Sequence, residues 1–333
     1  MAQGIGPLVF PARLAANDAR WTAAQQAQMK AVCVHTMQQQ VHLQHILSQA
    51  WTALMNAGIQ PVLMKGAGLA AYYPSPEQRP WGDIDLYVGK EQYHPACAVM
   101  RDTFPGALKF DEELDHYKHY NLIADGVSIE IHRVTVGHQH PVDEMRYEKM
   151  EHFGVQNACS LEVGGLRLKV FEPTFNALFV FLHSWEHMLT KGAILRQLVD
   201  LSFLLQHTHD AIDSKRLQQW LDELHLMDVW QLYMYILVHT LELPQTFAFF
   251  YTDAVAARAQ RLLQDLLAGT MMEPEHVSSA PTNRIARKMH TMQERMRNAD
   301  RIEQYSPSYA RHMRATTWLH GARRFFAKDR HWE

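Results

Sequence analysis

Cysteine is scarce in this chain, and long apolar runs are absent. The three cysteines, Cys33, Cys97 and Cys159, are spaced too widely for a disulfide framework or a cysteine zinc motif. We therefore expect a reducing, cytoplasmic setting. No apolar run approaches the roughly 20 residues that cross a bilayer, and the first residues lack a signal-peptide pattern, so no membrane partner is expected. A G-x-S-x-G nucleophile elbow is also missing, which argues against a serine hydrolase of that type.

Neither sign of charge is in large excess, although the charges are unevenly distributed. The chain has 32 Lys and Arg against 35 Asp and Glu, a net charge of −3 that does not indicate nucleic-acid binding. Residues 282–333, however, contain 12 basic and 5 acidic residues. Such a basic segment either contacts an anionic partner or is a solvated helical face that docks on the acidic remainder.

Two aspartates alternate with apolar residues in segment 79–88, which reads Arg-Pro-Trp-Gly-Asp-Ile-Asp-Leu-Tyr-Val. Because strand side chains alternate between faces, Asp83 and Asp85 share one face, while Ile84 and Leu86 point into a core. Two like charges a few Å apart need positive charge nearby, and a divalent cation is the simplest candidate. The alternative is a strand edge with solvated aspartates.

An anion-binding turn is predicted just upstream of these aspartates. The apolar residues 62–64 are followed by Lys65 and Gly66, which reads as a strand, a glycine turn and a helix start. A helix start attracts anions through its backbone N–H groups. Lys65 adds a full charge, and Arg79 adds a planar fork that suits phosphate. Phosphate-binding groups beside a carboxylate pair are what phosphoryl or nucleotidyl transfer needs.

A second segment with alternating apolar residues follows further along the chain. The dipeptide Asp-Gly at 125–126 is a two-residue hairpin signal that joins two strand-like segments, 117–124 and 127–134. Alternation in the second segment places Glu130 and His132 on the same face.

These motifs resemble the signature of a known family. Lys65-Gly66, Tyr73-Pro74, Arg79 and residues 82–86 look like those of the uncharacterised nucleotidyltransferase family, within the DNA polymerase β-like superfamily. The resemblance covers roughly residues 40–245. It implies an α+β fold with a small mixed-sheet nucleotidyltransferase core, an N-terminal helical segment and a C-terminal all-helical domain.

The resemblance also implies a reaction and a set of site residues. A nucleoside monophosphate would pass from a nucleoside triphosphate, ATP among them, to an acceptor, with the help of Mg²⁺ or Mn²⁺. The implied residues are the catalytic metal ligands Asp83, Asp85 and Glu130, and the nucleotide- or phosphate-binding residues Lys65, Gly66 and Arg79. The acceptor is not specified, and a small molecule, a saccharide and a protein all remain open.

Residues 183–187 spell H-x-x-E-H on a predicted helix, which is the inverted zinc-protease motif. A catalytic zinc needs a third protein ligand, and no local pattern supplies one. The resemblance also covers this helix. There we expect His183, His187, Arg196 and Asp200 to line the cleft between core and helical domain, with His132 as a further cleft residue. They would bind acceptor or phosphate, or form a structural polar network.

Three parts are expected along the chain. They are a helical segment over 1–58, with a helix start capped at 17–18, the α/β core over 59–171 and the helical domain over 172–333. An apolar helix face is expected to include Met37 and Val41. Strands are predicted at 61–64, 83–88, 107–110, 117–124, 127–134, 161–163 and 166–171, and helices at 67–73, 91–103, 174–190, 193–207, 213–225, 228–242, 246–267, 282–299 and 307–326.

Two other functions remain as alternatives to nucleotidyl transfer. One is a non-catalytic nucleotide-binding or scaffold protein on the same fold, and the other is a zinc metallohydrolase that uses the motif at 183–187. Magnesium-dependent nucleotide binding does not separate the enzyme from the binding protein. Release of pyrophosphate does, because only the transfer reaction produces it.

Overall fold

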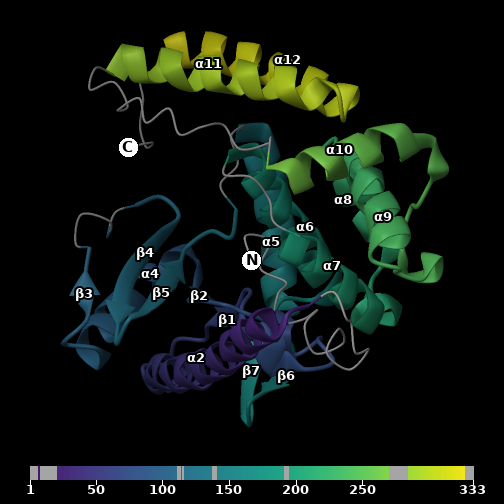
Figure 1. Cartoon of the computed structure of the whole chain (residues 1–333). Helices are drawn as coiled ribbons and strands as arrows, with labels where there is room; N and C mark the ends of the chain where they lie inside the picture. The colour runs from purple at the N-terminus through teal and green to yellow at the C-terminus, as the bar shows by residue number, and fades with distance from the viewer. Residues whose placement is uncertain are drawn as a thin grey trace.

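The computed structural model describes residues 21–110, 116–136, 141–190, 195–269 and 284–326, together with Pro7 and Leu114. The helix cap expected at 17–18 therefore lies outside the described residues. The element order is a long helix, a seven-stranded mixed sheet interrupted by helices, and then a series of helices (Figure 1). This order confirms the predicted α+β fold.

The sheet has the strand order β3-β4-β5-β2-β1-β7-β6. The strands are β1 (Val62–Leu63), β2 (Asp83–Tyr87), β3 (Leu108–Lys109), β4 (His119–Ala124), β5 (Val127–His132), β6 (Cys159–Val163) and β7 (Leu166–Val170). β2 pairs in parallel with β5, and this register places Asp85 directly opposite Glu130. The central pair of strands therefore aligns acids that are far apart in the sequence.

The predicted hairpin between β4 and β5 is confirmed. Asp125 and Gly126 have φ angles of 49° and 79°, and two successive positive φ values are what the favoured two-residue hairpin turn requires. The turn fixes the register, so His119 lies opposite His132. Both faces of β5 are thereby assigned, one to apolar packing and one to polar side chains.

The apolar face of the sheet packs against two helices, α2 (Ala23–Asn56) and α4 (Gly89–Thr103). Ile84 and Leu86 of β2 are fully buried in this cluster, as their alternation with the aspartates predicts. The opposite face of β2 carries Asp83 and Asp85. The strand thus anchors its acids through the apolar residues between them.

The buried face of α2 differs from the predicted one. Val41 and Met37 are 73% and 45% exposed, so the expected apolar stripe was wrong at these positions. Gln40 is buried instead, and its amide donates to the backbone carbonyl of Trp81 at 3.4 Å. The helix therefore turns a polar residue inward, where it supports the loop that leads into β2.

The remaining helices form one apolar cluster that includes Phe179, Trp185 and Trp230. They are α5 (Pro141–Gln156), α6 (Pro173–Thr190), α7 (Leu195–Thr208), α8 (Ser214–Glu223), α9 (Met227–Thr240), α10 (Ala256–Ala268), α11 (Arg284–Glu303) and α12 (Pro307–Phe326). Short helical turns are α3 (Ala67–Ala70), η1 (Pro76–Gln78), η3 (His209–Ala211), η4 (Gln245–Phe247) and η5 (Asp253–Val255). α11 and α12 run side by side (Figure 1), and Ile302 and Tyr305 join them to the cluster.

Two of these helices depart from the sequence prediction. No helix was predicted where α5 lies, because its sequence has no clear apolar periodicity. α10 begins at Ala256 rather than 246. Pro244 and the positive φ angles of Glu242 and Phe250, 55° and 62°, interrupt the chain before it. The part boundaries expected at 58–59 and 171–172 stay predictions.

Within the described ranges, no helix combines the length and hydrophobicity that a membrane crossing needs.

Candidate active site

Three carboxylates meet on the polar face of the sheet. Asp83 and Asp85 extend from β2 and Glu130 from β5, and each offers an oxygen within 4.8 Å of the other two. The parallel pairing of β2 with β5 produces this convergence, because it places residue 85 opposite residue 130. The structure therefore brings together the three acids that the sequence singled out. Carboxylate oxygens in such a group are suitable ligands for Mg²⁺ or Mn²⁺.

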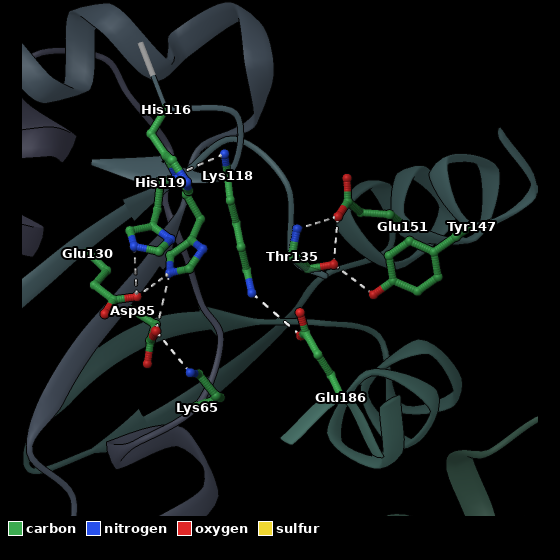
Figure 2. A network of polar contacts seen from close by, with 11 residues as sticks. Lys65, Asp85, His116, Lys118, His119, Glu130, Thr135, Tyr147, Glu151 and Glu186 are labelled. Atoms are coloured by element: carbon green, nitrogen blue, oxygen red, sulfur yellow. Dashed lines mark hydrogen bonds and ion pairs between the residues drawn. The ribbon is translucent and has the colours of Figure 1, made fainter. Parts of the chain in front are cut away.

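Asp85 is the most deeply buried of the three, with 1% of its surface exposed. Its Oδ1 accepts from Lys65 Nζ at 3.0 Å and lies 3.2 Å from His132 Nε2 (Figure 2). Its Oδ2 is buried and has no hydrogen-bond partner among the described residues. An unpartnered buried carboxylate oxygen is costly. The arrangement fits a site in which a cation satisfies this oxygen.

The three acids differ in their ionisation. The neighbouring Asp85 carboxylate and burial raise the pKa of Asp83. Burial acts to raise the pKa of Asp85, but the Lys65 ammonium and His132 hold it well below its usual range. For Glu130, burial acts to raise the pKa, but the hydrogen bond with His132 and the charges of His132 and His119 together lower it. Asp85 and Glu130 are therefore ionised at neutral pH, when they can bind a cation.

Two histidines border the acids. His132 Nε2 lies 3.1 Å from Glu130 Oε2, on the face where the sequence placed it. His119 Nε2 approaches the same oxygen at 3.9 Å, and sequence reasoning missed this residue. The signal was present, because a two-residue turn pairs residues that are equally distant from it, and 119 and 132 are such a pair.

A cavity of about 180 Å³ lies between the sheet and the helices α6 and α7. The residues that line it from the sheet side include Lys65, Gly66, Arg79, Trp81 and Asp83. From the helices, the predicted cleft residues His183, His187, Arg196 and Asp200 all line it as well. Eight of the eleven candidate site residues thus surround one cavity, and Asp85, Glu130 and His132 are not among the residues that line it.

Gly66 shapes the turn that follows Lys65. Its φ angle is +55°, and a Cβ atom there would lie 3.1 Å from the ring of Trp81, so both conformation and space require glycine. The helix after it, α3, has only four residues, fewer than predicted. Its dipole is correspondingly small, because the macrodipole grows with aligned peptide units. Phosphate attraction at this turn therefore rests mainly on side-chain charge.

The guanidinium of Arg79 is fully engaged by Asp200 and Gly66. Nε and Nη2 donate to the two carboxylate oxygens of Asp200 at 2.6 and 2.8 Å, and Nη1 donates to the carbonyl of Gly66 at 3.0 Å. Tyr73 also donates its hydroxyl to Asp200 at 2.6 Å. Arg79 and Asp200 are both almost completely buried. In this structure the fork expected at phosphate is thus occupied, and the pair clamps the glycine turn to α7.

Arg196 also lines the cavity, on α7. Its Nη1 donates to the carbonyl of Pro80 at 2.8 Å. Its Nε is buried and has no hydrogen-bond partner among the residues the structure describes. Burial and the nearby Arg79 lower the pKa of Arg196, but a guanidinium stays protonated at neutral pH. Arg196 therefore adds positive charge to the wall of the cavity.

The H-x-x-E-H motif does not form a metal site among the described residues. The rings of His183 and His187 are 4.5 Å apart, but Glu186 lies 3.5 Å from Lys118 Nζ (Figure 2). Neither of the two groups of described residues that could hold a metal includes these histidines. Burial and Lys65 lower the pKa of His183 well below its ordinary value, so this imidazole is neutral. The zinc-hydrolase alternative therefore finds no ligand set here.

The chain is similar in sequence to one known family. The sequence profile of a family described as "uncharacterised nucleotidyltransferase" matches residues 1–242. None of the curated proteins matches the chain. Among solved structures, an antigenic nucleotidyltransferase-like protein from Paracoccidioides brasiliensis is similar at 16% identity and a TM-score of 0.38, over 64% of this chain and 95% of that chain. Because the family profile spans well over half of the 333 residues, this chain belongs to the uncharacterised nucleotidyltransferase family.

Proposed function

We propose that this chain is an enzyme that transfers a nucleoside monophosphate from a nucleoside triphosphate to an acceptor. Asp83, Asp85 and Glu130 would hold Mg²⁺ or Mn²⁺. The observation that carries the proposal is the convergence of these three acids within 4.8 Å, beside a cavity with basic walls. The unpartnered Oδ2 of Asp85 supports it, since a bound cation would satisfy that buried oxygen.

The donor set suits a hard divalent cation. Oxygen ligands are those that Mg²⁺ and Mn²⁺ prefer, and Lys65 Nζ already supplies a positive charge 3.0 Å from Asp85. In reactions of this class, a bound divalent cation neutralises phosphate charge and lowers the pKa of an attacking hydroxyl.

Lys65 and Arg196 are the residues that would bind the phosphates. Lys65 balances Asp85 in this structure, and 16% of its side chain is exposed. Once another cation balances Asp85, Lys65 becomes free to contact phosphate oxygens as a point charge. Arg196 would contribute a second positive charge to the same cavity. Arg79 would act indirectly, by holding the carbonyl of Gly66 and so the shape of the turn.

Glu130 would accept the proton of the acceptor hydroxyl. It is ionised, and its side chain is 23% exposed, so an acceptor can approach it. A general base must lie within hydrogen-bond reach of the proton that it removes. His183 and His187 would line the acceptor side. Whether the acceptor is a small molecule, a saccharide or a protein, and whether the setting is cytoplasmic, stay predictions.

The test is transfer of label from each α-phosphate-labelled nucleoside triphosphate, with magnesium and a cell extract, together with a pyrophosphate assay. Asp85→Asn should reduce transfer by on the order of 1000-fold, because it removes a charge that binds the cation. The matched control is Asp210→Asn, since the Asp210 side chain is fully exposed in a turn.

Full labelling by the Asp85→Asn variant would contradict the assignment of the site. Wild-type chain that binds nucleotide but releases no pyrophosphate with any acceptor preparation would favour the non-catalytic alternative. Both variants should first give the wild-type circular dichroism spectrum, so that loss of folding is not mistaken for loss of a ligand.

A further inference from the structure

Two imidazole side chains lie beside the three acids, His132 on the same strand as Glu130 and His119 on the neighbouring strand β4. β4 and β5 pair so that His119 lies opposite His132, while Asn121 lies opposite Glu130. Residues opposite each other, and residues two apart on one strand, share a face of the sheet. His119, Glu130 and His132 therefore share one face, and Figure 2 shows His119 and Glu130 pointing toward each other.

The distances among these three side chains match a metal-ligand set. His119 Nε2 and His132 Nε2 lie 3.9 and 3.1 Å from the same oxygen, Glu130 Oε2. Ligand atoms bound tetrahedrally at about 2.0–2.1 Å lie roughly 3.3–3.4 Å from one another. The observed separations bracket this value, and all three ligand atoms lie within 4.8 Å of one another. Small rotations of the side chains would complete the geometry.

The environment of His132 also points to a cation. The side chain is 2% exposed, and its Nε2 lies 3.1 Å from Glu130 and 3.2 Å from Asp85. Two carboxylate oxygens and the two imidazole nitrogens are thus directed at one small region. In the metal-free chain a proton on His132 Nε2 bridges these two oxygens, and a bound cation would take the place of that proton.

We propose that His119, Glu130 and His132 form a second cation site, which shares Glu130 with the Asp83 and Asp85 set. Two imidazoles and one carboxylate favour a borderline transition-metal ion such as Zn²⁺, whereas Mg²⁺ prefers oxygen ligands. The two sites would therefore select different metals. The proposal concerns metal binding, so it stands or falls separately from the transfer reaction.

The experiment measures Zn²⁺ binding to the metal-stripped full chain by equilibrium dialysis in millimolar Mg²⁺, which occupies the carboxylate set. We expect about one Zn²⁺ per chain, and X-ray absorption of the bound zinc should show imidazole scattering. His119→Gln should weaken Zn²⁺ binding by at least about 100-fold, since removal of even an outer-shell partner costs 10–100-fold. His119 is partly exposed, so this variant should keep its fold.

Two variants make the result specific. His116→Gln is the matched control, because His116 lies close to His119, with ring centroids 5.2 Å apart, but outside the ligand group. It should retain wild-type Zn²⁺ affinity. Asp83→Asn should also retain it, because Asp83 belongs to the other set.

Unchanged Zn²⁺ affinity in His119→Gln would overturn the proposal, as would zinc that shows no imidazole scattering in the wild-type chain. Loss of Zn²⁺ in Asp83→Asn together with retention in His119→Gln would place the metal among the carboxylates instead. None of these outcomes depends on pyrophosphate release, so failure of this site and failure of the transfer proposal are distinguishable.

Discussion

Two buried aspartates near the same cavity differ in how their carboxylate oxygens are hydrogen-bonded. Asp200 on α7 receives two hydrogen bonds from Arg79 and one from Tyr73, so both of its oxygens are satisfied. In Asp85 on β2, Lys65 and His132 both contact one oxygen, Oδ1. The other oxygen, Oδ2, has no hydrogen-bond partner among the described residues. Both carboxylates are almost completely buried, so exposure does not explain the difference.

The difference indicates which charge is structural and which belongs to a site. A satisfied buried ion pair holds two segments together, and here it ties the loop before β2 to α7. Asp85 has no such role, because Lys65 and His132 balance one of its oxygens while the other has no partner among the described residues and lies beside two further acids. A strongly perturbed acid is therefore informative only when its partners are counted.

The largest expected effect on stability comes from replacing Asp200. Asp200→Asn leaves Arg79 as a buried charge without a counterion, which should lower the free energy of unfolding by about 3–5 kcal/mol. Asp83→Asn should leave it unchanged or raise it, because it removes repulsion from Asp85. Urea unfolding of both variants in a chelator measures the contrast. Equal destabilisation by the two substitutions would abolish it.

A smaller effect is expected when the whole ion pair is replaced. In Arg79→Met with Asp200→Leu, no buried charge is left alone, so most of the stability lost in Asp200→Leu should return. Recovery should fall short by about 1–3 kcal/mol, because Tyr73 loses its acceptor. A double-mutant cycle by urea unfolding gives the coupling energy. A double variant as unstable as Asp200→Leu would show that the clamp is not the source of stability.

The smallest expected effect on stability concerns Glu151, a buried acid whose hydrogen-bond donors are all uncharged groups. Its Oε1 accepts from the backbone and hydroxyl of Thr135 at 2.7 and 2.6 Å (Figure 2), and Oε2 accepts from Tyr87 at 3.0 Å. Burial raises the pKa of Glu151, so the folded chain binds this proton more tightly than the unfolded chain. Its contribution to stability is present below the ordinary carboxyl pKa and is lost as pH rises through the raised one.

Glu151→Gln should therefore flatten that pH dependence. Glutamine can keep the hydrogen bonds from Thr135 and carries no charge, so the variant should exceed the wild type by roughly 1 kcal/mol at pH 8 and not at pH 4. Thermal unfolding between these pH values is the measurement. The same difference at both ends of the range would mean that Glu151 does not titrate as described.

Much of the candidate site could be predicted because its determinants are local. Alternation along 83–88 placed both aspartates on one face, and the Asp-Gly turn fixed the face of Glu130. The two-residue turn also places His119 opposite His132, although His119 was not predicted as a site residue. These features depend on strand alternation and on a short turn, and both can be recognised from residues that are neighbours in the sequence.

The remainder depends on contacts between distant segments. Arg79 and Asp200 are 121 positions apart in the sequence. Nothing in either segment indicates that the guanidinium of Arg79, which was expected to bind phosphate, would bind a carboxylate of the chain itself. The buried face of α2 was misjudged because Gln40 turns inward to the carbonyl of Trp81. Its benefit is a hydrogen bond that hydrophobic periodicity cannot reveal.

The central claim is that Asp83, Asp85 and Glu130 form a site for a hard divalent cation. Calorimetric titration of Mg²⁺ into the metal-free chain tests it most directly, with Asp83→Asn as the variant and Asp210→Asn as the control. We predict binding to the wild type and to Asp210→Asn, and an affinity at least about 10-fold lower in Asp83→Asn. Equal Mg²⁺ affinity in wild type and Asp83→Asn, or no binding to a folded wild-type chain, would contradict the claim.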